Sequence, residues 1–206
     1  MITTDPEAAR SRFEGMRRVV QFNWTLYCAA AAAIGLAVAA ERESKIPRTL
    51  RTMAGIGASL VSLQTVASLV ASHWVYDLSP LHYWRWLRDV CRNPNPWKIV
   101  NVIAGYDETT GALARVFPNT EQNVIDFFSG LEQPESSIQR ARKMFPARVK
   151  PISQELSGWP FADGSIDLVL MPLSAHEVRD AAGRERLFKE AARVVNRSNG
   201  TIILVE

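Results

Sequence analysis

The stretch Lys98–Phe117, KIVNVIAGYDETTGALARVF, decides the architecture of the second half of the chain. An apolar run from Ile99 to Ile103 ends before Gly105, a short polar turn follows, and a helical pattern resumes after Gly111. We therefore expect a strand, a loop and the start of a helix. The carboxyl end of such a strand in a parallel sheet is a place where ligands bind, because the following amides and the helix N-terminus can donate hydrogen bonds.

The same alternation of apolar runs and helical patterns continues after a proline-punctuated linker at residues 93–96. We expect strands at 98–103, 123–128, 148–152, 165–173 and 201–206, with helices that end near 117 or span 134–145 and 183–195. Alternation of this kind predicts an α/β domain over residues 93–206 with a doubly wound, mostly parallel sheet.

Two long uncharged stretches, residues 19–40 and 52–76, dominate the first half of the chain. Each is long enough to cross a hydrocarbon core of about 30 Å as a helix, and the charged link ERESKIPRTLR between them suits a turn. We expect a transmembrane helical hairpin within residues 1–92, preceded by a short surface helix in PEAARSRFEGMRRVV that Asp5 and Pro6 begin. A cleaved signal peptide and a soluble, alanine-rich helical hairpin are the alternatives.

Basic residues flank both stretches and indicate an orientation. They precede the first stretch, lie in the link and follow the second stretch: Arg10, Arg12, Arg17, Arg18; Arg42, Lys45, Arg48, Arg51; Arg85, Arg88, Arg92, Lys98. Both ends of a hairpin lie on one side of a membrane, and those ends together hold more of the positive charge than the link does. The pattern predicts a multi-pass membrane protein whose second domain is cytoplasmic.

Tryptophans crowd the segment that joins the two halves, at Trp74, Trp84, Trp86 and Trp97. Aromatic side chains with a polar edge collect at membrane surfaces, so we interpret this segment as an interfacial helix. The alternative is that these rings cap the core of the following domain.

The charge balance favours a lipid partner over a nucleic acid. The net charge is +3 and the pI is near 9.1, but the basic residues are spread thinly, whereas nucleic-acid binding calls for a clustered stripe. The only cysteines, Cys28 and Cys91, have no spacing that suits a metal site or a disulfide framework. We therefore expect membrane lipid as a partner, no nucleic acid and no metal.

Two late segments carry a resemblance to a known family. WPFADGSIDLVLM and RLFKEAARVVNRSNGTIILVE resemble the segments around the fourth and fifth strands of class I S-adenosylmethionine (SAM)-dependent methyltransferases, and the likeness covers Lys98–Glu206. DFFSGLEQPESSIQRAR and AHEVRD resemble the ubiquinone and menaquinone biosynthesis type. The resemblance implies a Rossmann-like fold and SAM as the cofactor.

The family's glycine-rich cofactor loop falls on Asn101, Gly105 and Tyr106. Asn101 stands where the family has an acidic residue, while Ile103 and Asp107 stand where it has glycines. Gly105 is the position that matches, and a glycine is needed where the backbone passes close to a ligand or takes a positive φ.

Other cofactor residues follow from the same resemblance. Asp126 ends the second strand, where its carboxylate would accept hydrogen bonds from the ribose hydroxyls, and Phe127 would pack on the adenine. Gln154 and Glu155 fall near the adenine, and His176 after the fourth strand is the candidate base. The structural alternatives are a turn cap for Asp126, a solvated loop for Gln154 and Glu155, and a structural hydrogen bond for His176.

Together these features predict a membrane-anchored SAM-dependent methyltransferase that acts on a lipophilic small molecule. A catalytically inactive, membrane-tethered interaction module of the same fold is the alternative, and the altered glycine loop favours it. The family continues beyond its fifth strand with a helix and two strands, so we expect the strand that ends at Glu206 to present an apolar edge.

Overall fold

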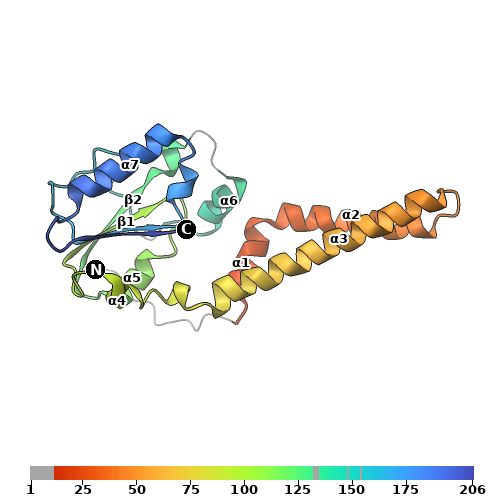
Figure 1. Ribbon diagram of the computed structural model, residues 1–206, viewed down its shortest axis with the longest axis horizontal. Helices are drawn as coiled ribbons and strands as arrows, with labels where there is room; N and C mark the ends of the chain where they lie inside the picture. Colours follow the sequence, from red (N-terminus) through yellow and green to blue (C-terminus); the bar gives the residue numbers. More distant parts are fainter. Residues whose placement is uncertain (1–11, 132–134, 148, 154) are drawn as a thin grey trace. The chain divides into compact units, whose positions relative to one another are not determined.

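The computed structural model describes residues 12–131, 135–147, 149–153 and 155–206. The chain divides into two compact units, Met1–His82 and Tyr83–Glu206 (Figure 1). The sequence predicts a boundary ten residues later, near Asn93. The difference arises because Trp84 and Leu87 are buried in the core of the second unit.

The first unit is helical and the second alternates strands with helices. The elements of the first unit are α1 (Glu14–Phe22), α2 (Trp24–Arg42), α3 (Arg48–His73) and a π-helical turn (Trp74–Leu78), followed by a 3₁₀ turn at the boundary (Pro80–Tyr83). Those of the second are α4 (Leu87–Val90), β1 (Lys98–Ile103), α5 (Thr110–Val116), β2 (Glu121–Asp126), α6 (Ser136–Met144), β3 (Leu168–Pro172), α7 (Ala181–Val194) and β4 (Thr201–Val205), with 3₁₀ turns at Phe127–Gly130 and Ala175–Glu177.

The strands form one four-stranded sheet in the order β2-β1-β3-β4. All of its pairs are parallel, with Ile103 opposite Asp126 across β1 and β2 and Asn101 opposite Leu170 across β1 and β3. The chain thus moves outward from β1 to one side and then returns to the other, which is the doubly wound arrangement. The predicted α/β fold class is confirmed.

The strand predicted at residues 148–152 is wrong. Ile152 donates a backbone hydrogen bond to Val124 (2.9 Å), and Asp126 donates one to Ser153 (3.0 Å), so the segment does run beside β2. Among its described residues, 149–153, the segment forms only an isolated parallel bridge, between Ser153 and Ile125. Pro151 has no N–H to offer the ladder, which limits the pairing to this short contact. Arg148 lies outside the described residues.

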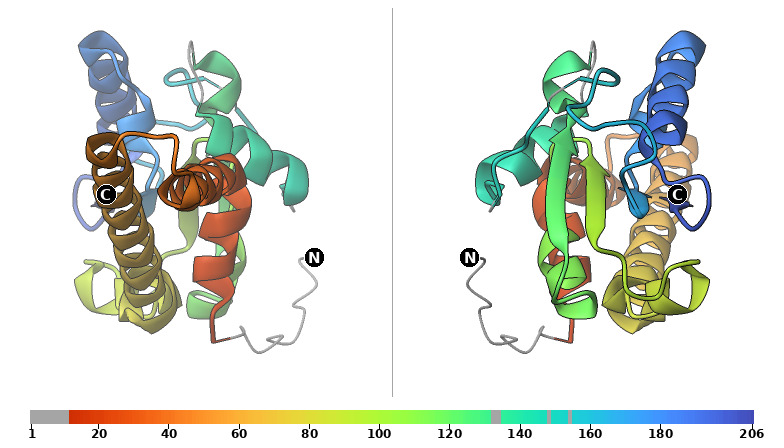
Figure 2. Two further views of the ribbon diagram at one scale, coloured as in Figure 1. Left: turned by 90° about the vertical axis from the view of Figure 1, so that its right-hand side faces the viewer. Right: turned by 90° about the vertical axis from the view of Figure 1, so that its left-hand side faces the viewer.

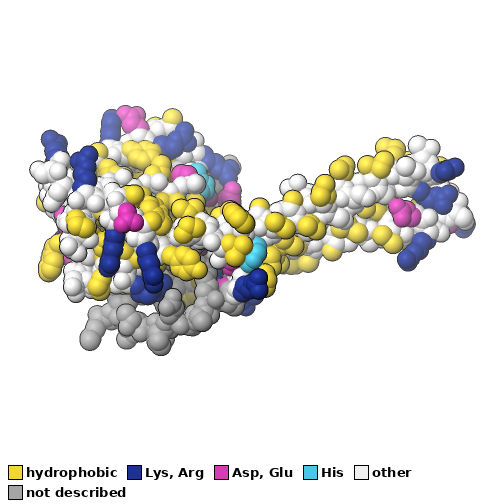
Figure 3. Space-filling model, turned by 60° about the horizontal axis from the view of Figure 1, so that its bottom comes forward, with side chains coloured by type: hydrophobic (Ala, Val, Ile, Leu, Met, Phe, Trp, Pro, Cys, Tyr) yellow, Lys and Arg dark blue, Asp and Glu magenta, His cyan; other side chains and the backbone are white. Residues whose placement is uncertain are grey.

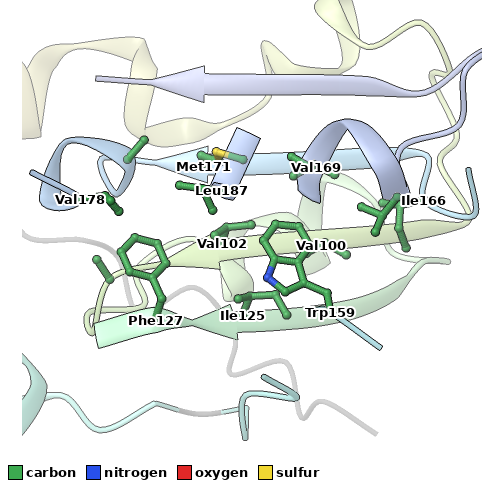
Figure 4. Close-up of a cluster of buried hydrophobic side chains, with 14 residues drawn as sticks. Val100, Val102, Ile125, Phe127, Trp159, Ile166, Val169, Met171, Val178 and Leu187 are labelled. Atoms are coloured by element: carbon green, nitrogen blue, oxygen red, sulfur yellow. The ribbon is translucent and has the colours of Figure 1, made fainter. Parts of the chain in front are cut away.

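One face of the sheet packs against α7. Val100 and Val102 point to this face because alternate residues of a strand share a side, and Figure 4 shows them with Ile125 and Met171 around the side chain of Leu187 from α7. The strands β1 and β3 read as continuous apolar runs because both of their faces are covered.

The opposite face of the sheet packs against α5 and the segment that contains α4. Ile99 and Leu168 meet Leu113 of α5 there, together with Trp84 and Leu87. Nε of Arg88 donates a hydrogen bond to the carbonyl oxygen of Val116 (2.9 Å), which attaches α4 to the end of α5. Trp84 and Leu87 therefore lie in the core of the α/β unit, as the alternative interpretation predicts, whereas Trp74 and Trp97 are exposed.

β4 lies at the edge of the sheet, as expected. Ile203 and Val205 pack against the cluster that includes α5, whereas Ile202 and Leu204 are exposed. Phe188 of α7 is also exposed. Apolar side chains thus border this edge.

In the first unit, α2 and α3 form an antiparallel helical hairpin whose large apolar side chains are mostly exposed. Leu63, for example, is 67% exposed, and Figure 3 shows hydrophobic side chains along the hairpin and charged ones gathered at its turn. Two helices are long and apolar enough to cross a membrane, judged by length and composition: Trp24–Arg42, with 19 residues, and Arg48–Leu78, with 31.

The first predicted span, residues 19–40, is interrupted at Asn23. The helix α1 ends at Phe22 and α2 begins at Trp24, and Nδ2 of Asn23 donates a hydrogen bond to the carbonyl oxygen of Val19 (3.1 Å). An asparagine side chain can satisfy backbone groups locally and so ends a helix more readily than an apolar residue does.

Asp77 attaches α1 to the end of the hairpin. Its carboxylate accepts hydrogen bonds from the backbone N–H groups of Gly15 (2.6 Å) and Met16 (3.1 Å) at the start of α1, and it also contacts Nδ1 of His73 (3.0 Å). The first amides of a helix have no partner within the helix and favour a negative charge. The π-helical turn after α3 supplies that charge.

The buried position of Leu187 gives a test of this packing. Replacing Leu187 by Ala should lower the free energy of unfolding by about 2–5 kcal/mol, because a fully buried leucine leaves a cavity when it is truncated. Phe188→Ala, at the neighbouring exposed position of α7, is the control and should give a clearly smaller loss. Urea titrations of the detergent-solubilised chain, followed by tryptophan fluorescence, measure both. Equal losses at the two positions would contradict the packing.

Candidate functional site

The carboxyl ends of β1, β2 and β3 meet at one edge of the sheet. Since Ile103 pairs with Asp126, the loop that begins at Ala104 lies beside the end of β2. The sheet order reverses between β1 and β3, and ligands of doubly wound sheets bind outside this reversal. The predicted residues of the cofactor loop and of the β2 end are therefore brought together.

Gly105 turns the chain out of β1 with a positive φ of 96°. A Cβ atom at this position would lie 2.5 Å from the ring of Phe128, which is closer than real Cβ contacts allow. Both observations require glycine here. Gly111, by contrast, has open space where its Cβ would be.

Asn101 and Asp107 organise the start of α5. Nδ2 of Asn101 donates to Oγ1 of Thr109 (2.7 Å) and of Thr110 (2.9 Å). Oδ1 of Asp107 accepts hydrogen bonds from the N–H groups of Thr109 (3.2 Å) and Thr110 (2.9 Å). Asp107 therefore caps the helix that follows the loop, and the sequence signal for this role is an acidic residue just before the first helical turn.

Oδ1 of Asn101 is buried and has no hydrogen-bond partner among the described residues. A buried acceptor without a partner is rare because its desolvation is not repaid. This oxygen therefore remains available to a donor that the described residues do not supply.

Asp126 is 1% exposed and carries two contacts. Its Oδ1 accepts a hydrogen bond from the N–H of Phe128 (3.2 Å), so the carboxylate caps the turn that follows β2. Its Oδ2 forms an ion pair with Nη1 of Arg142 from α6. Asp126 thus lies at the end of β2 and serves as a turn cap, while its role in binding ribose stays a prediction.

Arg142 is the residue that sequence reasoning missed. Besides Asp126, its Nη1 approaches the carbonyl oxygen of Gly105 (3.5 Å), and its guanidinium carbon lies 5.0 Å from the ring centroid of Phe128. Arg142 therefore connects the loop after β1 with the end of β2. Figure 2 shows α6 next to β2. The only sequence signal was a cluster of basic residues in the helix after the second strand.

Aromatic rings border the same loop. The ring of Tyr106 lies 6.0 Å from that of Phe145, centroid to centroid. Phe127 is 1% exposed and points into the core cluster (Figure 4), whereas Phe128 is half-buried beside Gly105. Phe128 therefore replaces Phe127 as the ring that could contact a ligand at this edge.

Glu155 follows the short segment that pairs with β2 and is exposed. Its N–H donates to Oγ of Ser153 (3.3 Å), and its carbonyl oxygen accepts a hydrogen bond from Nε1 of Trp159 (3.0 Å). These contacts fix the backbone and leave the carboxylate at the edge of the sheet. Gln154 lies outside the described residues.

His176 lies beyond the end of β3, in the turn Ala175–Glu177. Its imidazole stands between two carboxylates: Nδ1 contacts Glu206, and Nε2 lies 3.3 Å from Oε1 of Glu177. Burial raises the pKa of Glu177, and the nearby Glu135 adds to the effect, while His176 and Arg179 oppose it.

No group of three His, Cys, Asp or Glu side chains in the described part of the chain could hold a metal ion.

Residues 106–204 match the family model of the methyltransferase domain. This part of the chain is similar to a methyltransferase domain. The match supports a class I SAM-dependent methyltransferase and SAM as the cofactor. No curated protein sequence matches the chain.

Solved structures give weak likenesses to the methyltransferase domain. A proposed SAM-dependent methyltransferase of Methanococcus maripaludis is 16% identical, with a TM-score of 0.39 over 60% of this chain and 53% of that one. A SAM-dependent methyltransferase of Thermotoga maritima is 20% identical, with a TM-score of 0.39 over 68% and 57%. A third, from Aquifex aeolicus, is 18% identical, with a TM-score of 0.35 over 59% and 64%. The chain thus spans a little more than half the length of these proteins.

The residues of the methyltransferase domain fit an adenosyl cofactor in three respects. Gly105 has the positive φ and the absence of a side chain that a close ligand loop requires. Asp126 places a buried carboxylate at the end of β2, and Asn101 offers an acceptor without a partner among the described residues. Arg142 forms an ion pair with Asp126, so both carboxylate oxygens of Asp126 have partners within the protein.

Gly105 and Gly111 form a matched pair for testing the cofactor loop. Gly105→Ala should destabilise the methyltransferase domain by about 1–3 kcal/mol, because the residue has a positive φ and its Cβ would meet Phe128. Gly111→Ala, within α5 and with open space around it, should be neutral or stabilising by up to about 1 kcal/mol. Urea unfolding of both variants measures the difference, and equal effects would contradict this loop geometry.

Proposed function

We propose that this chain is a membrane-anchored SAM-dependent methyltransferase that methylates a lipophilic small molecule. The observation that carries the proposal is the pairing of Ile103 with Asp126. This pairing places Gly105, where no other residue fits, beside the buried carboxylate of Asp126 within the methyltransferase domain. Among the described residues, no other strand end combines a glycine of positive φ with a buried carboxylate.

Each residue of the site has a proposed part in binding. When bound, SAM supplies an electrophilic methyl group on a sulfonium. Asp126 accepts hydrogen bonds from ribose hydroxyls, Phe128 offers a ring face to the adenine, and Glu155 stands at the same edge. Gly105 leaves the space beside the strand end open to the ligand. Methyl transfer depends chiefly on aligning the acceptor with the methyl group, so orientation is the main service of these residues.

His176 is the proposed group that takes a proton from the acceptor. It lies beyond β3, on the rim of the ligand edge, and its side chain is 54% exposed. Both ring nitrogens face carboxylates, so one of these contacts must open before the imidazole can accept a proton from another group. Glu177 is the positioning residue in this arrangement because it is buried and fixed beside the ring.

The hairpin supports the proposed anchor and the class of acceptor. Its leucines and valines are exposed over two helices of membrane-spanning length, and exposed apolar area of that extent is unusual on a protein surrounded by water. A membrane enzyme meets lipophilic acceptors at their highest concentration, which agrees with the resemblance to quinone-type biosynthesis. The distribution of basic residues favours a cytoplasmic catalytic domain.

One observation favours the second candidate function, an inactive interaction module. Asp126 is paired with Arg142, and Asp107 already satisfies the amides at the start of α5. A domain that has lost its ligand would fill its site with such internal contacts. Binding of the demethylated cofactor separates the two functions.

The first test measures binding of S-adenosylhomocysteine to the detergent-solubilised chain by isothermal titration calorimetry. We expect saturable binding that Asp126→Ala weakens at least about tenfold, because hydrogen bonds to a charged group contribute about 1.5–3 kcal/mol. Asp89→Ala, at an exposed position of α4, is the control and should bind like the wild type. Absence of saturable binding at millimolar ligand would overturn the enzyme proposal.

The second test concerns the membrane. After expression, the chain should stay with the membrane pellet through extraction with alkaline carbonate. A variant with Leu36→Arg and Leu60→Arg should be released or degraded, because an arginine at mid-helix costs about 2.5–3.5 kcal/mol on insertion scales. Release of the wild-type chain into the supernatant would contradict the anchor.

A further inference from the structure

We propose that Arg142 competes with the cofactor for Asp126, so that the affinity of the site is set by how readily α6 gives up this ion pair. The inference rests on the proposed function. It adds a residue, and a conformational step, that the family match does not assign.

The contacts of Asp126 carry the argument. Its side chain is 1% exposed, and its two oxygens are used by the N–H of Phe128 and by Arg142. A ribose diol binds a carboxylate by donating its hydroxyl hydrogens. The guanidinium of Arg142 donates to Oδ2 of Asp126, so it occupies a position that a ribose hydroxyl would need.

The remaining contacts of Arg142 cover the rest of the ligand edge. The guanidinium approaches the carbonyl oxygen of Gly105 and lies over the ring of Phe128. Those two residues are the backbone loop and the aromatic face that the proposed cofactor would use. Without a ligand, the side chain of Arg142 thus contacts the Asp126 carboxylate, the Gly105 carbonyl oxygen and the Phe128 ring at the same time.

The pair is also able to open. Asp126 is buried on the sheet, but the side chain of Arg142 is 35% exposed and extends from a nine-residue helix. A guanidinium that reaches water loses little by swinging outward, whereas the buried carboxylate cannot follow it. Removing a partner from a buried carboxylate is unfavourable, so opening occurs when hydroxyl donors replace the guanidinium.

This competition lowers the apparent affinity. If the site accepts ligand only while Arg142 is displaced, the apparent dissociation constant equals the intrinsic one divided by the fraction of open molecules. Removing the guanidinium should therefore tighten binding. A purely structural Arg142 predicts the opposite, because its loss would loosen α6 and the loop.

The experiment measures ligand binding to the full chain in detergent micelles by isothermal titration calorimetry. The variants are Arg142→Ala, Arg142→Lys and the control Arg140→Ala, whose arginine donates to Ser136 on the same helix. We expect S-adenosylhomocysteine to bind Arg142→Ala at least about fivefold more tightly than the wild type. Arg142→Lys should lie between them, and Arg140→Ala should stay within about twofold of the wild type.

Two nucleosides test whether the ribose is the competing group. Adenosine should gain affinity from Arg142→Ala, while 2′,3′-dideoxyadenosine, which lacks the hydroxyls, should not. Hydrogen exchange gives a readout on the unmodified protein: adding S-adenosylhomocysteine to the wild type should speed exchange in residues 136–144 as Arg142 is released. This readout holds even if Arg142→Ala fails to fold.

The outcomes separate the two proposals. Suppose that the wild type binds S-adenosylhomocysteine. Equal or weaker binding by Arg142→Ala would then overturn the competition and leave the methyltransferase function intact. Slower exchange in α6 on adding ligand would have the same meaning. Failure of the wild type and every variant to bind S-adenosylhomocysteine would overturn the proposed function and this inference together.

Discussion

The parallel pairing of β1 with β2 is the constraint on which the site depends. Because Ile103 lies opposite Asp126, the turn at Gly105 and the carboxylate of Asp126 reach the same edge from different parts of the sequence. A shift of one residue in this register would turn Asp126 to the other face of the sheet. Val124 and Ile125 of β2 are fully buried on opposite faces of the sheet, so such a shift would also disrupt their packing on both faces. Core packing thus fixes the positions of the polar residues.

The sequence predicted the elements of this domain well and their contacts less well. Apolar runs and helical periods are local signals, so the strands around 98–103 and 201–206 and the helix α7 were found. The pairing of Arg142 with Asp126 depends on how α6 returns toward the sheet, and no local pattern records that return. The strand at 148–152 failed for a local reason, because Pro151 removes a donor from the ladder.

Phe127 and Phe128 show that the sequence did not distinguish a core ring from a ring at the ligand edge, even between neighbouring residues. Both rings follow Asp126 directly, and the family resemblance selected Phe127. Both residues begin the 3₁₀ turn Phe127–Gly130, in which successive side chains point about 120° apart, so one ring enters the core while the other borders the loop. The core cluster takes Phe127, and the missing Cβ of Gly105 makes room for Phe128. The choice follows from packing on the far side of the sheet, which a motif does not describe.

The replacement of a loop glycine by Asp107 changes the site in a definite way. In a glycine-rich loop the amides at the start of the next helix can bind a ligand. Here the carboxylate of Asp107 accepts hydrogen bonds from Thr109 and Thr110, so those two amides are already satisfied within the protein. A ligand carboxylate would also be repelled by Asp107. We therefore infer that a cofactor would be held mainly through its adenosyl part, at Asp126 and Phe128, while Asn101 would offer an acceptor through its buried Oδ1. On this reasoning, the proposed competition of Arg142 for Asp126 would affect cofactor binding more in this chain than it would beside a loop with free amides.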